Sequence, residues 1–161
     1  CAAVDDLLSG GSVIPAPSTA IHFELFSVST TRKLSQIDAA VSADGVEPIT
    51  FVLYRGDARL GTFDLVNQKA VPGQANSQVS STGSVAFNLT AGKFYLVAVA
   101  VKGMHTASVV EGSAPTPVSF GQQLGGFTYV AGAVATIPNQ VLVSDGLIRD
   151  GISLRLVTTL P

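Results

Sequence analysis

The chain has 161 residues, a length that suits one domain with a sizeable hydrophobic core. Only 12% of the residues are charged and the formal net charge is -2, which excludes a basic surface for nucleic acid or anionic lipid. Hydrophobic residues make up 47%, yet the longest apolar run, Phe94–Val101, is too short for a membrane-spanning helix.

Residues 1–19 are rich in glycine, proline and other small residues. This composition predicts an extended N-terminal arm ahead of a single domain over residues 20–161. A plain tether needs no apolar side chains, but this arm carries Val4, Leu7, Leu8, Val13 and Ile14. We expect these five residues to form a self-assembly arm that adds a strand to the open sheet edge of a neighbouring copy.

Cys1 is the only cysteine, so no disulfide can form within the chain. It is followed by Ala2 and Ala3, and such a start resembles the mature N-terminus of bacterial lipoproteins, in which the cysteine carries lipid. A trimmed N-terminus and a cysteine that pairs between chains are the alternatives. A lipid on Cys1 is the only link to a membrane that we expect.

From residue 20 onward the pattern is that of short strands. Ile21, Phe23 and Leu25 alternate with other residues and predict a half-buried strand. Residues 31–43 have both helical and strand spacing, and we favour a strand because apolar residues alternate over 37–43.

Two hairpins are predicted in the middle of the chain. Residues 49–54 and 60–66 flank the turn sequence Arg55-Gly56-Asp57, and residues 84–89 and 93–102 flank Thr90-Ala91-Gly92. The polar segment 67–83 between them is predicted to be a loop. Phe94–Val101 has no polar face, so we expect this strand to be covered on both sides.

Further strands are predicted at 127–134, 141–143 and 151–159. Many short strands with 16 glycines, 8 prolines and no clear long helix predict an all-β fold. We expect an antiparallel β-sandwich of jelly-roll or Greek-key type.

Residues 48–101 carry a resemblance to a known group of domains. The strand Thr50-Phe51-Val52-Leu53-Tyr54 and the later run from Phe87 through Gly92 to Val99 are similar to hairpins of pre-peptidase C-terminal-type domains, which are extracellular bacterial sandwich modules. The resemblance implies a non-catalytic module of a secreted protein. The chain differs in having almost 60 residues after Lys102.

Candidate chemical sites are few. His22 and His105 are the only histidines, and no spacing typical of a zinc site or of a serine nucleophile is present. We therefore expect no enzyme activity and no cofactor. Asp44, Glu47 and Asp57 lie around a predicted hairpin, where turn formation is the favoured role and a calcium site is the weaker alternative.

Charge is almost absent between residues 103 and 144, where Glu111 is the only acid or base apart from His105. Within this stretch Val118, Phe120, Leu124, Phe127 and Tyr129 are predicted to form an interface or ligand surface. Free protein surfaces usually carry mixed charge and avoid large apolar patches, so we expect this surface to be covered.

Two functions follow from these features. The first is a structural subunit, secreted or anchored at the cell surface, that assembles with copies of itself into a fibre, sheath or layer. The alternative is a secreted module that binds carbohydrate or another ligand, with Phe127 and Tyr129 as the best stacking residues.

Overall fold

A computed structural model describes residues 1–8, 12–16, 20–43, 48–73, 78–101, 105–111, 115–130, 137–148 and 150–161. These residues form β-strands and one short 3-10 helix, η1 (Asp145–Leu147). Every strand pair among them is antiparallel. The predicted all-β antiparallel sandwich is therefore confirmed.

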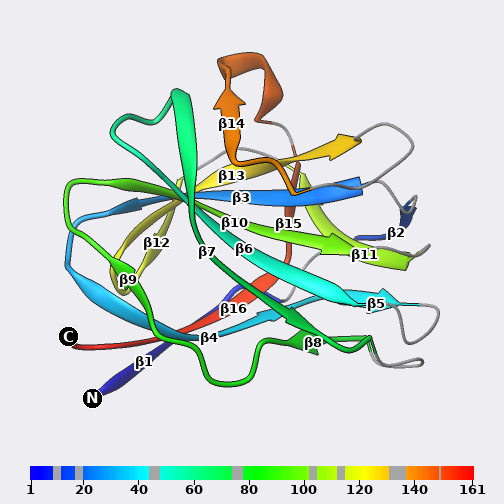
Figure 1. Ribbon diagram of the computed structural model, residues 1–161, viewed down its shortest axis with the longest axis horizontal. Helices are drawn as coiled ribbons and strands as arrows, with labels where there is room; N and C mark the ends of the chain where they lie inside the picture. The colour runs from blue at the N-terminus through cyan, green and yellow to red at the C-terminus, as the bar shows by residue number, and fades with distance from the viewer. Residues whose placement is uncertain are drawn as a thin grey trace.

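The largest sheet has seven strands in the order β12-β13-β3-β10-β6-β7-β14 (Figure 1). Their bounds are β3 (Ala20–Val28), β6 (Ile49–Gly56), β7 (Gly61–Val71), β10 (Phe94–Val101), β12 (Thr116–Val118), β13 (Gly121–Val130) and β14 (Gln140–Val143). The apolar strand β10 lies in the middle and pairs with both β3 and β6. A central position suits it because both of its faces need cover.

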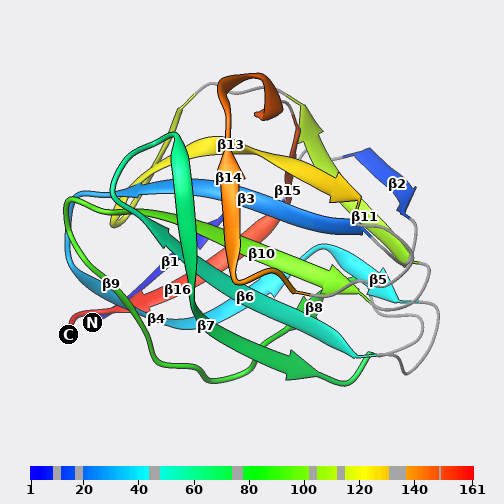
Figure 2. The same ribbon diagram turned by 45° about the horizontal axis from the view of Figure 1, so that its top comes forward.

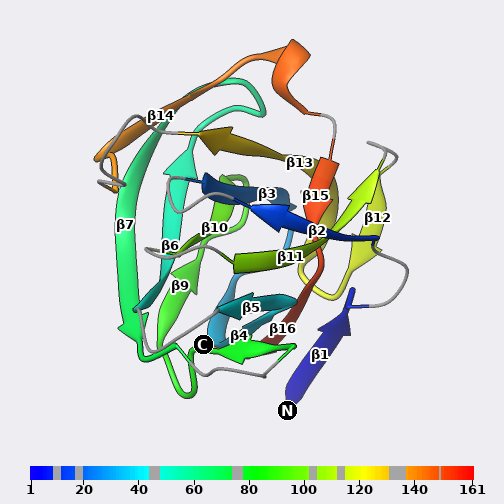
Figure 3. The same cartoon turned by 90° about the vertical axis from the view of Figure 1, so that its right-hand side faces the viewer.

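Two smaller sheets pack against one face of the large sheet (Figures 2 and 3). One has the order β1-β16-β4-β8 with β9 beside β4, and the other has the order β15-β11-β2 with β5 beside β11. Their bounds are β1 (Ala2–Asp6), β2 (Ser12–Ala16), β4 (Arg32–Ala39), β5 (Val41–Ala43), β8 (Ser80–Ser81), β9 (Phe87–Leu89), β11 (His105–Glu111), β15 (Asp150–Ile152) and β16 (Leu154–Thr159).

Hydrophobic clusters fill the space on both faces of the large sheet. The cluster between the sheets includes Phe26, Phe51 and Leu156. The second cluster, on the other face, includes Phe23 and Phe63 from the sheet, together with residues of β14 and of the segment after η1. Figure 3 shows the large sheet curling so that β14 returns over this face. Both faces of β10 are thus covered, as predicted.

The prediction of an extended N-terminal arm ahead of the domain is wrong for the described residues 1–8 and 12–16. β1 pairs with β16, and β2 pairs with β11 of the same chain. Leu7 packs against the inner cluster and its amide donates to the carbonyl of Leu154 at 2.8 Å. The Asp5 carboxylate accepts hydrogen bonds from the amide and hydroxyl of Ser119. Leu7 therefore packs within its own chain, where no association cost opposes the contact.

The second predicted hairpin is also wrong. β9 pairs with β4 in a small sheet, whereas β10 pairs with β3 and β6 in the large one. The turn between them exists, with Gly92 at a φ of 83°. Because both edges of β10 are taken by strands of the large sheet, no edge is left for β9, and the turn carries the chain from one layer to the other.

Other segments follow the predictions more closely. The hairpin of β6 and β7 is confirmed, but β7 runs on to Val71, five residues into the predicted loop that starts at Asn67. Residues 32–39 and 41–43 form strands as favoured. The predicted strand 151–159 is two strands, β15 and β16, which belong to different sheets and are separated at Ser153.

Candidate functional site

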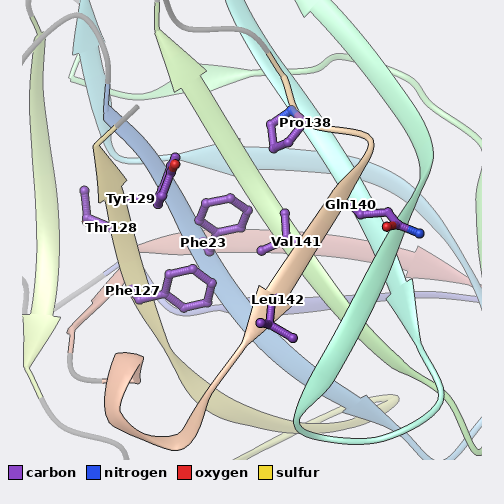
Figure 4. Close-up of a pocket in the computed structure, with 8 residues that line it drawn as sticks. All are labelled: Phe23, Phe127, Thr128, Tyr129, Pro138, Gln140, Val141 and Leu142. Carbon is purple, nitrogen blue, oxygen red and sulfur yellow. The ribbon is translucent and has the colours of Figure 1, made fainter. Parts of the chain in front are cut away.

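A groove of about 300 Å³ lies between β13 and β14 on the curled face of the large sheet (Figure 4). Its described lining is Phe23, Phe127, Thr128, Tyr129, Pro138, Gln140, Val141 and Leu142. None of these residues carries a charge. The size is at the lower end of the range for small-molecule sites, and the mostly apolar lining is typical of them.

Strand alternation explains why aromatic rings meet in the groove. Phe127 and Tyr129 are two residues apart on β13 and therefore point to the same side. Phe127 is the cross-strand partner of Phe23, and their rings stack with centres 4.6 Å apart and an interplanar angle of 12°. This stacked pair is buried and forms a rigid apolar floor.

The lips of the groove are exposed. The side chain of Tyr129 is 54% exposed on β13, and that of Leu142 is 69% exposed on β14. Gln140, also on β14, donates from its Nε2 to Oδ1 of Asp64 at 2.8 Å. This hydrogen bond holds the amide in one orientation. Figure 4 shows the Gln140 side chain on the side of β14 that faces away from Phe127 and Tyr129, so the exposed ring of Tyr129 is the main feature that a ligand in the groove meets.

The chain ahead of β14 is held to the sheet. The hydroxyl of Tyr54 donates to the carbonyl of Pro138 at 2.7 Å, and the amide of Leu65 donates to the carbonyl of Asn139 at 2.9 Å. Burial raises the pKa of Tyr54 to about 12, so its hydroxyl keeps its proton and remains a donor. One wall of the groove is therefore fixed before any ligand arrives.

Buried polar groups lie behind the other wall. Glu24 of β3 is fully buried on the inner face, where its Oε1 accepts a hydrogen bond from Nε2 of Gln123 at 2.6 Å. Its Oε2 has no hydrogen-bond partner among the described groups. Burial raises the pKa of Glu24 to about 8, although hydrogen bonds from Gln123 and from the Ile152 amide act to lower it. The carboxyl group is thus neutral at pH 7.

A histidine pair lies on the same face of β3. The Nε2 atoms of His22 and His105 are 2.9 Å apart, and Nδ1 of His22 is 3.1 Å from the hydroxyl oxygen of Thr128. Burial and the neighbouring His105 lower the pKa of His22 to about 4. His105 is the first residue of β11.

The histidine pair has the geometry of a hydrogen bond. The ring centres are 5.2 Å apart while the two nitrogens are 2.9 Å apart, so both nitrogens lie close to the line that joins the rings. Two ligands of one metal would instead direct their lone pairs toward a common third point. In the part of the chain that the structure describes, no group of three or more His, Cys, Asp or Glu side chains is placed to hold a metal ion.

The predicted surface residues separate into two groups. Phe127 and Tyr129 come together in the groove. Phe120 and Leu124 belong to the inner and outer clusters, so their prediction as surface residues is wrong, and Val118 is half-buried against the inner cluster. The low charge of residues 103–144 therefore has two causes. Some side chains of this region, such as Phe120 and Leu124, lie in the hydrophobic clusters, and others line the groove.

The remaining predicted residues do not form a site with the groove. Asp44 and Glu47 lie outside the described residues, and Asp57 is exposed and pairs with Lys93. Cys1 is exposed with a free thiol. The arm residues Val4, Val13 and Ile14 are exposed on the edge strands, while Leu7 and Leu8 are half-buried.

Sequence reasoning missed most of the groove and all of the buried polar cluster. Phe23, Val141 and Leu142 were visible only as strand residues, because nothing local tells that β14 folds back over β3. A signal did exist for Glu24 and His22. They alternate with apolar residues in β3. A charged or polar residue in such a place is either exposed or buried with hydrogen-bonding partners.

No protein-family model and no curated protein matches the chain. Among solved structures, it is similar to the clostridial cysteine protease Cwp84 after propeptide cleavage, with a TM-score of 0.53 and 13% identity, over 99% of this chain and 40% of that chain. A second structure, Eiger TNF from S. frugiperda, has 14% identity over 84% of this chain and 61% of that chain, but its TM-score of 0.29 supports no argument.

The likeness to Cwp84 shows the fold alone, because the identity is so low. This chain corresponds to less than half of the protease's length, so nothing of the protease's activity is transferred to it. Among the described residues, no helix has the length and apolar character needed to cross a membrane.

Proposed function

We propose that this chain is a non-catalytic carbohydrate-binding module and that the groove between β13 and β14 is its ligand site. The observation that carries the proposal is the exposed ring of Tyr129 on the lip of an uncharged groove. A pyranose has a flat face of C–H groups that packs on such a ring, and hydroxyls at its edges that hydrogen-bond to amides.

Because the described lining of the groove carries no charge, we expect it to bind neutral carbohydrates rather than charged ones. A sulfated or uronic-acid polymer would gain no ion pair in the groove and would lose hydration of its anions there. A neutral sugar has no such penalty. The expected ligands are therefore neutral polysaccharides and oligosaccharides.

Replacing Tyr129 with alanine tests the proposal. We expect the affinity for a neutral polysaccharide to fall about tenfold, because one stacking contact of about 1.4 kcal/mol is lost. Tyr129→Phe keeps the ring and should bind nearly as well as the unmodified protein. Binding is measured by calorimetry after a screen against starch, xylan, mannan and a mixed-linkage β-glucan, with heparin as the charged comparison.

Leu160→Ala is the matched control. Leu160 is 57% exposed, a fraction close to that of Tyr129, but it lies in the C-terminal segment beyond β16. The substitution should leave binding unchanged. Binding of none of the neutral polymers, or equal binding by Tyr129→Ala, would contradict the carbohydrate proposal.

Self-association is a second candidate, favoured by the exposed apolar residues Val4 and Val13 on β1 and β2. The strands β1, β2 and β12 each lie at the edge of a sheet, and all three are poor templates for pairing with a neighbouring chain. β1 carries Asp5 and Asp6, and β2 and β12 each carry a proline that cannot donate to a ladder.

We therefore expect the protein to remain a monomer in multi-angle light scattering up to millimolar concentration. Val13 is 72% exposed, so Val13→Asp should leave this mass unchanged. Growth of the mass with concentration in the unmodified protein, reversed by Val13→Asp, would support the assembly role instead.

A further inference from the structure

We propose that the protonation state of Glu24 sets the ligand affinity of the groove, because β13 forms one wall of the groove and also lies against this carboxyl group. The inference rests on the proposed binding function and adds a regulation to the same site. The two faces of β13 have different neighbours.

One face of β13 points into the groove and the other points at Glu24. Phe127 and Tyr129 line the groove, while Gly126 is the cross-strand partner of Glu24. A Cβ atom at Gly126 would be 2.6 Å from Oε2 of Glu24 and 2.7 Å from the Cα atom of Gly151. The carboxyl group is thus enclosed between the backbones of β13 and β15, next to the residue that carries the groove's floor.

The enclosure suits a neutral acid. A carboxylic acid needs fewer partners than a carboxylate, and among the described side chains only that of Gln123 hydrogen-bonds to Glu24, at Oε1. With a pKa of about 8, the group loses its proton between neutral and mildly alkaline pH. The carboxylate then needs water, and water reaches Oε2 only if β13 and β15 separate.

Separation of these strands changes the groove. Phe127 follows Gly126 directly, so a displacement of β13 moves the ring that stacks on Phe23 and with it the position of Tyr129. Ligand binding to the undistorted groove favours the protonated form of Glu24, and by linkage deprotonation weakens binding.

The neighbouring His22 does not produce the same pH dependence. His22 on β3 has a pKa of about 4 and stays neutral throughout the relevant range. Its partner on β11 is His105, and on β10 the residue beside Glu24 is Val97, with the hydroxyl of Tyr95 accepting from the amide of Thr90. Gln123 and Gly126 on β13 and Gly151 on β15 do not titrate.

The experiment measures affinity for the neutral polysaccharide selected by the screen at pH 6.5 and at pH 9. We expect binding to be about fivefold weaker at pH 9 in the unmodified protein and unchanged with pH in Glu24→Gln, which keeps the shape without the ionisation. Asp6→Asn, at an exposed carboxylate on β1, is the matched control and should keep the fivefold change.

A second measurement needs neither ligand nor substitution. The carboxyl carbon of Glu24 and the backbone amides of Phe127 and Tyr129 are followed by NMR from pH 6 to pH 9.5. We expect the three signals to move together with a midpoint near the pKa of about 8. Amides that do not move while the carboxyl carbon titrates would overturn the coupling.

The two proposals fail in different ways. Absence of any neutral ligand at pH 6.5 removes the binding function, and the NMR titration then still decides whether Glu24 acts on β13. Binding that is strong and equal at both pH values keeps the binding function and overturns the inference.

Discussion

Replacing Gly126 with alanine is expected to destabilise the protein by at least about 3 kcal/mol. The added Cβ would overlap the backbone carbonyl oxygen of Phe23 and would approach Oε2 of Glu24 to 2.6 Å and the Cα atom of Gly151 to 2.7 Å. Two of these three neighbours are backbone atoms in paired strands, so they cannot move aside as a side chain can. The substitution therefore separates β13 from β3 or from β15.

Urea unfolding followed by circular dichroism measures this loss. Gly146→Ala is the control, because Gly146 lies in η1 and has nothing within 4 Å of an added Cβ. We expect it to change stability by less than about 0.5 kcal/mol. A Gly126→Ala protein as stable as the control would show that β13 and β15 are not closely packed around Glu24.

Stability is expected to fall as the pH rises from neutral to alkaline values, and Glu24 is the cause. In the unfolded chain the carboxyl group loses its proton near the ordinary glutamate pKa of 4.5, whereas in the folded protein it keeps the proton up to a pKa of about 8. Between these values the folded protein binds more protons than the unfolded chain, so each step up in pH favours unfolding. The full loss above pH 8 is about 5 kcal/mol relative to acidic pH, of which about 2 kcal/mol falls above pH 6.5.

His22 shapes the acidic side of the same profile. Its pKa falls from 6.5 to about 4 on folding, so the unfolded chain binds the extra proton and stability decreases as the pH drops through this window. Between about pH 4.5 and 6.5 the contributions of His22 and Glu24 have opposite signs and nearly cancel. We therefore expect a broad stability maximum at mildly acidic pH.

Glu24→Gln separates the two contributions. Urea unfolding of this variant at pH 6.5 and pH 8.5 should give equal stabilities, while the unmodified protein loses about 2 kcal/mol over the same interval. Asp6→Asn should lose as much as the unmodified protein, since that carboxylate is exposed. An unmodified protein whose stability is flat from pH 6.5 to pH 9 would mean that Glu24 is ionised in the fold.

Local pattern was enough for the strands themselves. The alternation of Ile21, Phe23 and Leu25, the β-branched and aromatic residues of 49–54 and the doubly apolar run of β10 each predict a strand, and each strand exists. These features depend on neighbours along the chain, because alternation and β-branching act within one strand. The prediction that β10 is covered on both faces was also confirmed, because a strand without a polar face must bury both of them.

The pairing of strands depended on the whole molecule. Thr90–Gly92 has the composition of a hairpin turn, but β9 and β10 join different sheets because β3 and β6 occupy both edges of β10. Residues 1–19 have the composition of an arm, yet β1 and β2 add edge strands to the two small sheets. In both cases distant strands compete for the same edge, and no short segment of sequence records which of them wins.

The candidate site divides in the same way. The amino-acid sequence alone determined that the protein is an all-β chain with little charge, and it pointed to Phe127 and Tyr129 as aromatic residues in an uncharged region. Only the tertiary structure brought Phe23 and β14 to them as a groove, and only it placed Glu24 between Gly126 and Gly151. The physical reason is that hydrophobic alternation is a local property, whereas a groove or a buried acid is defined by which strands fold over one another.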